Sequence, residues 1–161
     1  MRGVEMTDKD FLKLAIEKAK ESVAQGGFPV GAVIVQDGDV VSFGISNGKQ
    51  LKDPTSHAEV AAIREACQKL QNRDLKDATL YSSLEPCLMC YAASIWASIP
   101  RVAYACGRDK VSTMHYEGNH NLGEINDASR RPIELIHLTE LEEESLAVIE
   151  GWEKSLQKAN P

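Results

Sequence analysis

The chain has 161 residues, of which 43% are hydrophobic and 26% charged, and these values are ordinary for a globular protein that can bury a sizeable core. This length predicts one domain over residues 1–161, and the lack of a long apolar run excludes a membrane-spanning helix. The formal net charge of −6 disfavours a nucleic-acid-binding protein, because phosphate contacts call for basic patches, although a local patch can hide in the net value.

The first regular pattern predicts a helix over residues 7–25, where apolar residues recur at helical spacing. Thr7 and Asp10 resemble a capping box at its start. We expect residues 1–6 to form a short disordered tail. Because this charged beginning does not resemble a signal peptide, we expect a cytoplasmic protein.

The middle of the chain alternates between strand and helix patterns. Two β-rich runs, residues 30–36 and 40–45, are joined by Asp37-Gly38, a strong hairpin signal. The pattern then predicts a loop over 47–56, a helix over 57–70, a strand over 79–82, a fully buried helix over 87–97, a strand over 101–106, a loop over 107–131, a strand over 133–138 and a helix over 139–157 capped by Thr139 and Glu142. This order predicts an α/β fold, a mixed sheet with helices on both faces.

Two short motifs carry the chemistry. His57-Ala58-Glu59 and Pro86-Cys87-Leu88-Met89-Cys90 supply three zinc ligands, His57, Cys87 and Cys90, and a carboxylate, Glu59, that need not bind the metal. Three protein ligands leave a tetrahedral zinc ion with one open position, as in catalytic zinc sites that hold a water molecule. Glu59 is then the candidate general acid and base, which takes protons from that water and returns them during the reaction.

Each motif follows a predicted loop and opens a predicted helix, so the positive end of a helix dipole would face the metal from two sides. Helix N-termini and zinc both favour thiolate over thiol. The alternative is half of a closed structural zinc site, which needs further ligands. No second C-x-x-C pattern occurs in the sequence. His115 and His120, spaced as H-x4-H, could complete such a site, but that would leave Glu59 and Pro86 unexplained.

The pattern H-x-E followed by P-C-x-x-C is the signature of zinc nucleobase deaminases, and with it the chain resembles the cytidine deaminase superfamily. The resemblance implies a three-layer α/β/α sandwich around a five-stranded sheet. It is closest to bacterial guanine deaminases and tRNA adenosine deaminases, which share the sequences at residues 53–60 and 84–87.

Other segments resemble one or the other branch. Residues 28–32, with the sequence F-P-V-G-A, and residues 78–81 are similar to the tRNA deaminases. Residues 95–97, with the sequence I-W-A, and the length of the following loop are similar to the guanine deaminases. The chain ends without the aromatic tail that the guanine branch tends to carry, since no aromatic residue follows Trp152.

The resemblance also implies site residues and partners. It implies substrate contacts from Asn47, Ala58 and Glu117, of which Glu117 is the acid nearest to the position where guanine deaminases read the purine. Asn47 precedes Gly48, so a simple turn role is the alternative. A single zinc ion as cofactor and a homodimer are implied as well.

The hypothesis is therefore a zinc-dependent hydrolytic deaminase of a small nucleobase, most directly guanine to xanthine with release of ammonia. The main alternative is a deaminase of the tRNA wobble adenosine, which basic side chains near the zinc would favour; the candidates are Lys49, Lys52, Arg108, Lys110, Arg130 and Arg131. Deamination of cytosine, a pterin or a triazine, and a non-catalytic zinc-binding module, stay open.

Overall fold

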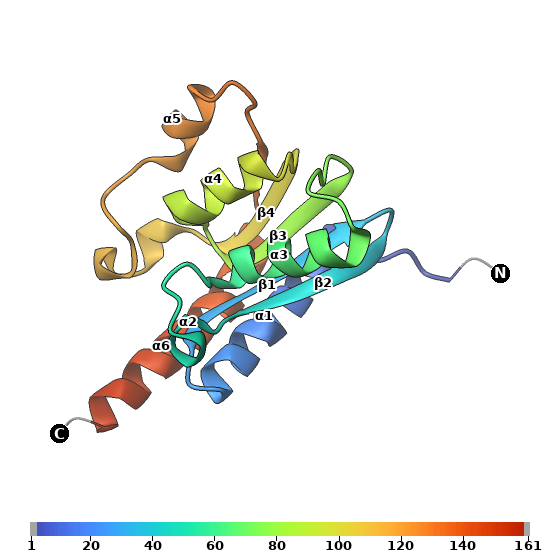
Figure 1. Cartoon of the computed structure of the whole chain (residues 1–161). Coiled ribbons are helices and arrows are strands. Elements are labelled where there is room, and N and C mark those ends of the chain that lie inside the picture. Colours follow the sequence, from blue (N-terminus) through green and yellow to red (C-terminus); the bar gives the residue numbers. More distant parts are fainter. Residues whose placement is uncertain (1–2, 160–161) are drawn as a thin grey trace.

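A five-stranded sheet forms the centre of the computed structural model, which describes residues 3–159 (Figure 1). The strand order is β2-β1-β3-β4-β5. β1 is antiparallel to β2 and β3, whereas β3, β4 and β5 are parallel, so the mixed five-stranded sheet is confirmed. The strands are β1 (Phe28–Gln36), β2 (Asp39–Ser46), β3 (Ala78–Leu84), β4 (Arg101–Cys106) and β5 (Glu134–His137).

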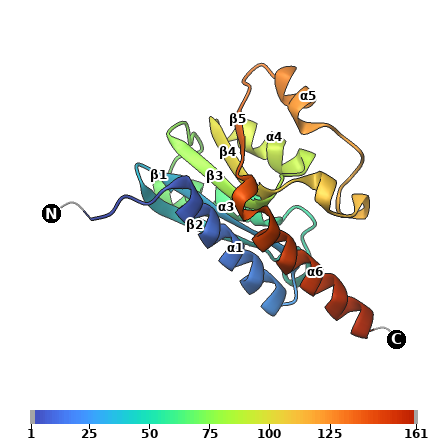
Figure 2. The same ribbon diagram turned by 180° about the vertical axis from the view of Figure 1, so that it is seen from behind.

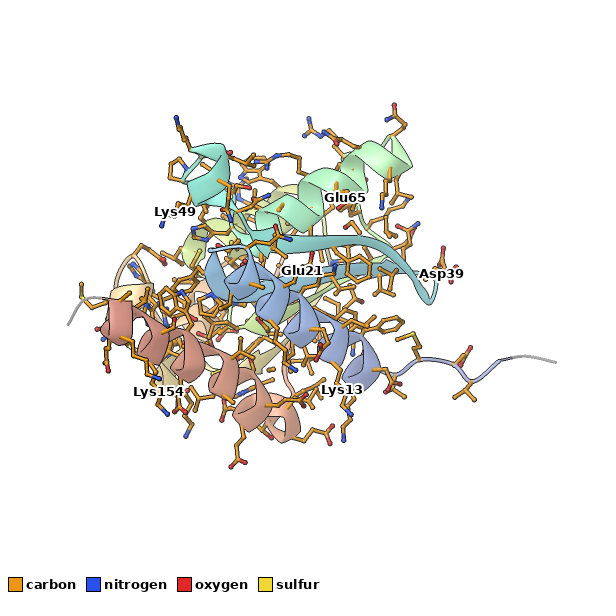
Figure 3. All side chains as sticks on the ribbon, turned by 90° about the horizontal axis from the view of Figure 1, so that it is seen from below. Lys13, Glu21, Asp39, Lys49, Glu65 and Lys154 are labelled. Carbon is orange, nitrogen blue, oxygen red and sulfur yellow. The ribbon has the colours of Figure 1, made fainter. Side chains whose placement is uncertain are left out.

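Helices cover both faces of the sheet. The longer ones are α1 (Asp8–Ala24), α3 (Ala58–Leu70), α4 (Leu88–Trp96) and α6 (Glu142–Ala159). α1 and α6 lie side by side on one face, and α3 and α4 lie on the other (Figures 1 and 2). Figure 3 shows the layers from below, with Glu65 of α3 and Lys154 of α6 on opposite sides of the sheet. The three-layer α/β/α sandwich is confirmed.

The two faces bury separate apolar clusters. One packs β1, β3 and β4 against α3 and α4 and includes Ile34, Leu80 and Val102. The other packs the opposite sheet face against α1 and the 3-10 turn Thr139–Leu141 that precedes α6, and includes Ile16, Val33 and Leu141. Strands buried on both faces explain why their sequences read as nearly continuous apolar runs.

Local signals set several boundaries as expected. Asp37 and Gly38 have φ values of 53° and 80°, the left-handed pair that a two-residue hairpin turn requires. The Thr7 side chain accepts from the backbone N–H of Asp10, and the Asp10 side chain accepts from that of Thr7. This reciprocal capping box confirms the predicted start of α1.

Other expectations were wrong. The predicted loops contain a one-turn helix, α2 (Gly48–Leu51), and a short helix, α5 (Leu122–Asp127). Glu142 does not cap α6 with Thr139; its carboxylate accepts from Gly107 N at 2.9 Å and lies 2.8 Å from His137 Nε2. α4 is not buried all round, because Trp96 is 75% exposed.

The beginning of the chain is only partly described. Residues 1 and 2 of the predicted tail lie outside the described residues, and residues 3–7 run away from the sheet without regular structure (Figure 1). Among residues 3–159, no helix combines the length and the apolarity that crossing a bilayer requires.

Gly44 brings α3 close to the sheet. A Cβ at this position of β2 would collide with Ala58 O and would lie 2.7 Å from Ala62 N. The backbone of the first turn of α3 therefore rests directly on β2. Because His57 and Glu59 flank Ala58, this close approach fixes the height of both side chains above the sheet.

We expect Gly44→Ala to destabilise the protein by about 3 kcal/mol, since a methyl group must push backbone rather than a flexible side chain. Gly151→Ala is the matched control, because a Cβ there meets no atom within 4 Å and alanine should stabilise α6 by up to about 1 kcal/mol. Denaturant unfolding of both variants measures the difference. Equal stability of the two variants would contradict the close approach of α3 to β2.

Candidate active site

The three predicted ligands meet where two helices begin. His57 is the N-cap residue of α3, Cys87 is the N-cap residue of α4, and Cys90 lies one turn further along α4. His57 Nδ1 lies 3.5 Å from Cys87 Sγ and 3.6 Å from Cys90 Sγ. One ligand atom from each residue falls within 4.8 Å of the other two, so a single ion can contact all three.

The ionisation of this group fits a divalent cation. A hydrogen bond from Cys90 is the main cause that lowers the pKa of Cys87 to about 4. The same hydrogen bond, with burial, raises the pKa of Cys90. Two adjacent thiols therefore resist joint ionisation in the protein alone, and a cation that binds both as thiolates removes the conflict. An imidazole and two thiolates are the donor set that suits zinc.

Glu59 stands beside the ligands as a buried carboxylate. Its side chain is 4% exposed. Oε1 accepts from Ser82 Oγ at 2.9 Å, and Oε2 accepts from Cys90 Sγ at 3.3 Å. Burial raises the pKa of Glu59 above its ordinary value, so this carboxyl is suited to take up and return protons near neutral pH.

A cavity of about 300 Å³ opens over this group. Its polar lining residues are His57, Glu59, Cys87, Ser46, Glu85 and His115, and the remaining lining comes from Phe28, Val30, Ala58, Leu84, Met114 and Tyr116. A cavity of this size, mostly apolar with a few converging polar groups, matches a small planar ligand.

An aromatic cluster forms one wall of the cavity. The Phe28 ring lies 5.1 Å from His115 and 5.0 Å from Trp152, both edge to face. His115 Nε2 lies 2.9 Å from Glu153 Oε1, which ties the 3-10 turn at residues 113–115 to α6. His115 therefore faces α6 and the cavity wall, and a closed metal site with His120 does not form around Cys87 and Cys90 among the described residues.

The three predicted substrate contacts take different positions. Ala58 lines the cavity. Asn47 borders a neighbouring hollow, where its Oδ1 accepts from Ser56 Oγ at 2.6 Å. Glu117 Oε1 accepts from Leu88 N at 3.0 Å, which places the carboxylate at the N-terminus of α4, directly beyond Cys87. Substrate contact by each of the three stays a prediction.

Some of the basic residues considered for RNA binding are engaged within the chain. The Arg108 side chain is 16% exposed and turned inward, and Arg131 Nη1 donates to Ser98 Oγ. Lys49 lines a hollow that His57 also borders. Arg108 and Arg131 are therefore poorly placed to contact phosphates as a patch around the cavity.

Comparison with known proteins agrees with this geometry. The family defined as the cytidine and deoxycytidylate deaminase zinc-binding region matches residues 5–106, and the chain belongs to this family. Zinc is accordingly its cofactor, and His57, Cys87 and Cys90 are the group of described residues positioned to bind a metal.

Individual relatives fall into both branches. The chain is 38% identical to guanine deaminase of Bacillus subtilis over 155 residues, 95% of this chain and 98% of that protein. It is 43% identical to tRNA-specific adenosine deaminase of Aquifex aeolicus over 95 residues, 59% of this chain and 63% of the relative. The chain thus spans just under two thirds of the Aquifex protein.

Solved structures show the same division. A structure from a study of tRNA:A34 deaminases at the wobble position has a TM-score of 0.76 and 31% identity, covering 87% of this chain and 99% of that one. The X-ray structure of the Bacillus subtilis guanine deaminase has a TM-score of 0.65 and 37% identity, covering 92% and 95%. The predicted resemblance to the superfamily is confirmed, and the chain is similar to members of both branches, which act on different substrates.

Sequence reasoning missed one residue that contacts Glu59. Ser82 Oγ is fully buried and donates to Glu59. The signal was the pair of adjacent serines at 82 and 83 within a strand, since a buried hydroxyl requires a hydrogen-bond partner.

Proposed function

We propose that the protein is a zinc-dependent deaminase that hydrolyses guanine to xanthine and ammonia. The observation that carries the proposal is the small cavity over His57, Cys87 and Cys90, with the buried Glu59 in its lining. Support for a free base comes from the acidic chain, with a net charge of −6, and from similarity to a guanine deaminase along 95% of the sequence.

The residues of the cavity have defined tasks in this reaction. The chemistry that zinc supplies when bound is activation of a water molecule near neutral pH. Glu59 accepts a proton from that water as a C–O bond forms at the amino-bearing ring carbon. The carboxyl delivers this proton to the adjacent ring nitrogen. It then takes the remaining proton from the new hydroxyl group and passes it to the amine, which leaves as ammonia as the C–N bond breaks and the C=O bond forms. The apolar wall around Phe28 and Leu84 limits competing water.

Glu117 and Asn47 are proposed to read the edge of the base. A guanine edge offers N–H donors, which a carboxylate such as Glu117 accepts well. The hydrogen bond from Ser56 Oγ to Asn47 Oδ1 orients the amide so that its nitrogen serves as a donor. Ala58 contributes to the cavity lining through its place at the start of α3.

Ammonia release tests the proposal. The zinc-loaded protein is given guanine, guanosine, adenine, cytosine, a pterin, a triazine and an anticodon stem with a wobble adenosine. Turnover of guanine is expected. Turnover of the stem alone would replace the proposal by the second candidate, a tRNA wobble adenosine deaminase, which the 43% identity to the Aquifex enzyme favours. Steep loss of stem binding with added salt would accompany that outcome.

A homodimer in the cytoplasm completes the proposal. Trp96 projects from α4 with 75% of its surface exposed, and large exposed aromatic residues are typical of interfaces. The thiols of Cys67 and Cys106 are unpaired, as is usual in a reducing compartment.

Sedimentation tests the dimer. The natural chain is expected to sediment with the mass of two copies, and Trp96→Glu is expected to sediment as one copy, because it places a charge in an apolar contact. The control Leu156→Glu changes another exposed apolar residue, on α6 and 47% exposed, and should stay dimeric. A natural chain with the mass of one copy would overturn the dimer.

A further inference from the structure

Arg108 lies two residues after the end of β4, and its side chain contacts several separate parts of the chain. It opens the 3-10 turn Arg108–Lys110 directly after Gly107, whose N–H is fixed by Glu142 at 2.9 Å. The backbone that presents the guanidinium is therefore anchored to the start of α6, and the side chain, 16% exposed, has a fixed base from which to act.

The guanidinium reaches three parts of the chain at once. Nη2 donates to Gly118 O at 3.0 Å, and Nη1 donates to His120 O. The guanidinium carbon lies 4.1 Å from the centroid of the Tyr116 ring, a cation–π distance. Nε lies 3.8 Å from Glu85 Oε2, an oxygen that has no hydrogen-bond partner among the described residues.

These contacts bracket Glu117. Tyr116, the residue before it, is held by the guanidinium over its ring and by its own hydroxyl, which donates to Glu85 O at 2.7 Å. Gly118, the residue after it, is held because its carbonyl oxygen accepts from Arg108 Nη2. With both neighbours fixed, the Glu117 carboxylate is kept where it accepts from Leu88 N at the N-terminus of α4. Tyr116 itself and Glu85 line the zinc cavity.

We propose that Arg108 is a positioning residue for substrate recognition, which acts by holding residues 116–118, and with them Glu117, next to the part of the zinc cavity that Tyr116 lines. Arg108 keeps this loop ordered before the base binds. Binding therefore costs less conformational entropy, and the Glu117 carboxylate is already in position to accept from the base. The part that concerns the substrate rests on the proposed function. A lysine can replace Arg108 only in part, since a point charge lacks the planar fork that reaches two carbonyls and a ring together.

Three variants of the full-length, zinc-loaded enzyme test the proposal. Arg108→Met keeps the alkyl chain and removes the guanidinium, whereas Arg108→Lys keeps the charge and loses the fork. Lys110→Met is the matched control, because it makes the same charge change two residues away at an exposed site. The measurements are hydrogen exchange of the amides of residues 112–121, zinc content, and KM and kcat for the base that the ammonia assay identifies.

For Arg108→Met we expect exchange in this segment to be about ten-fold faster and KM to rise about ten-fold, as loss of charge-assisted hydrogen bonds implies. We expect kcat and zinc content to change little, because Glu59 and the ligands are not contacted. Arg108→Lys should show a smaller rise in KM, and Lys110→Met should match the natural enzyme.

A double variant separates positioning from a general loss of stability. If Arg108 acts through Glu117, Arg108→Met should raise KM no further in a Glu117→Gln background, because coupled residues are not additive. Rises that multiply would overturn the proposal, and so would natural exchange rates in Arg108→Met. If the natural enzyme turned over none of the bases, the proposed function would fail, while the exchange measurement would still show whether Arg108 holds the segment.

Discussion

Glu59→Gln is expected to lower the rate of deamination by about 10³-fold and to leave zinc bound, within the range that general acid–base groups contribute. Glutamine has the size of glutamate and can keep the hydrogen bond from Ser82 Oγ, now 2.9 Å from Glu59 Oε1. It cannot accept and return a proton at neutral pH. The loss should therefore fall on kcat, with KM little changed.

The control for this variant lies on the same helix. Glu65→Gln makes the same chemical change at a site where the carboxylate pairs with Lys69, 2.8 Å away on the surface of α3, and such pairs contribute little. Its kinetics should match those of the natural enzyme. Ammonia release and zinc content are measured for both. A Glu59→Gln variant with the natural rate would show that the carboxylate does no chemistry and would overturn its assignment as the general acid and base, whereas a natural protein that releases no ammonia would favour a non-catalytic zinc-binding module.

The metal ligands could be predicted from sequence because their signals are local. A ligand at an N-cap position requires only a loop, a helix start and a ligand side chain, and all three are readable at His57 and at Cys87. The spacing of Cys87 and Cys90 within one turn fixes their relation without any knowledge of the fold.

The loop over residues 107–131 shows why other parts could not be predicted. α5 has only six residues, too few for a periodic signal, and it is held by tertiary contacts. Asn126 Oδ1 accepts from the Tyr91 hydroxyl at 2.7 Å and from Ile133 N at 2.8 Å. An asparagine that joins α4, α5 and the start of β5 is indistinguishable, in sequence, from a loop asparagine.

Arg108 and Glu142 are two charged residues whose partners could not be predicted from the sequence either. In the sequence, Arg108 is a candidate phosphate ligand and Glu142 a capping residue. In the structure both turn inward, Arg108 to the carbonyls of residues 118 and 120 and Glu142 to Gly107 N. Partners ten or more residues away decide these roles, and composition or spacing does not encode them.

Cys90→Ala is expected to have the second largest effect, loss of stable zinc binding together with activity. Removing one of three ligands leaves His57 and Cys87, and even changes outside the ligand set cost about 10- to 100-fold in metal affinity, so a larger loss is expected. Cys90 is fully buried, and binding free energy at such a site is also folding free energy. The melting temperature of the variant should therefore approach that of natural protein treated with a chelator.

Cys67→Ala is the matched control for this substitution, because Cys67 lies on α3 and belongs to the apolar cluster rather than to the ligand group. Zinc content after dialysis, competition with a chromogenic chelator, and melting with and without EDTA distinguish the two variants. Acid should weaken zinc binding by the natural protein, since His57 and both thiols must lose protons to bind. If Cys90→Ala bound zinc as tightly as Cys67→Ala, the metal would have to be held by other residues, and the catalytic assignment of Glu59 would fall with the site.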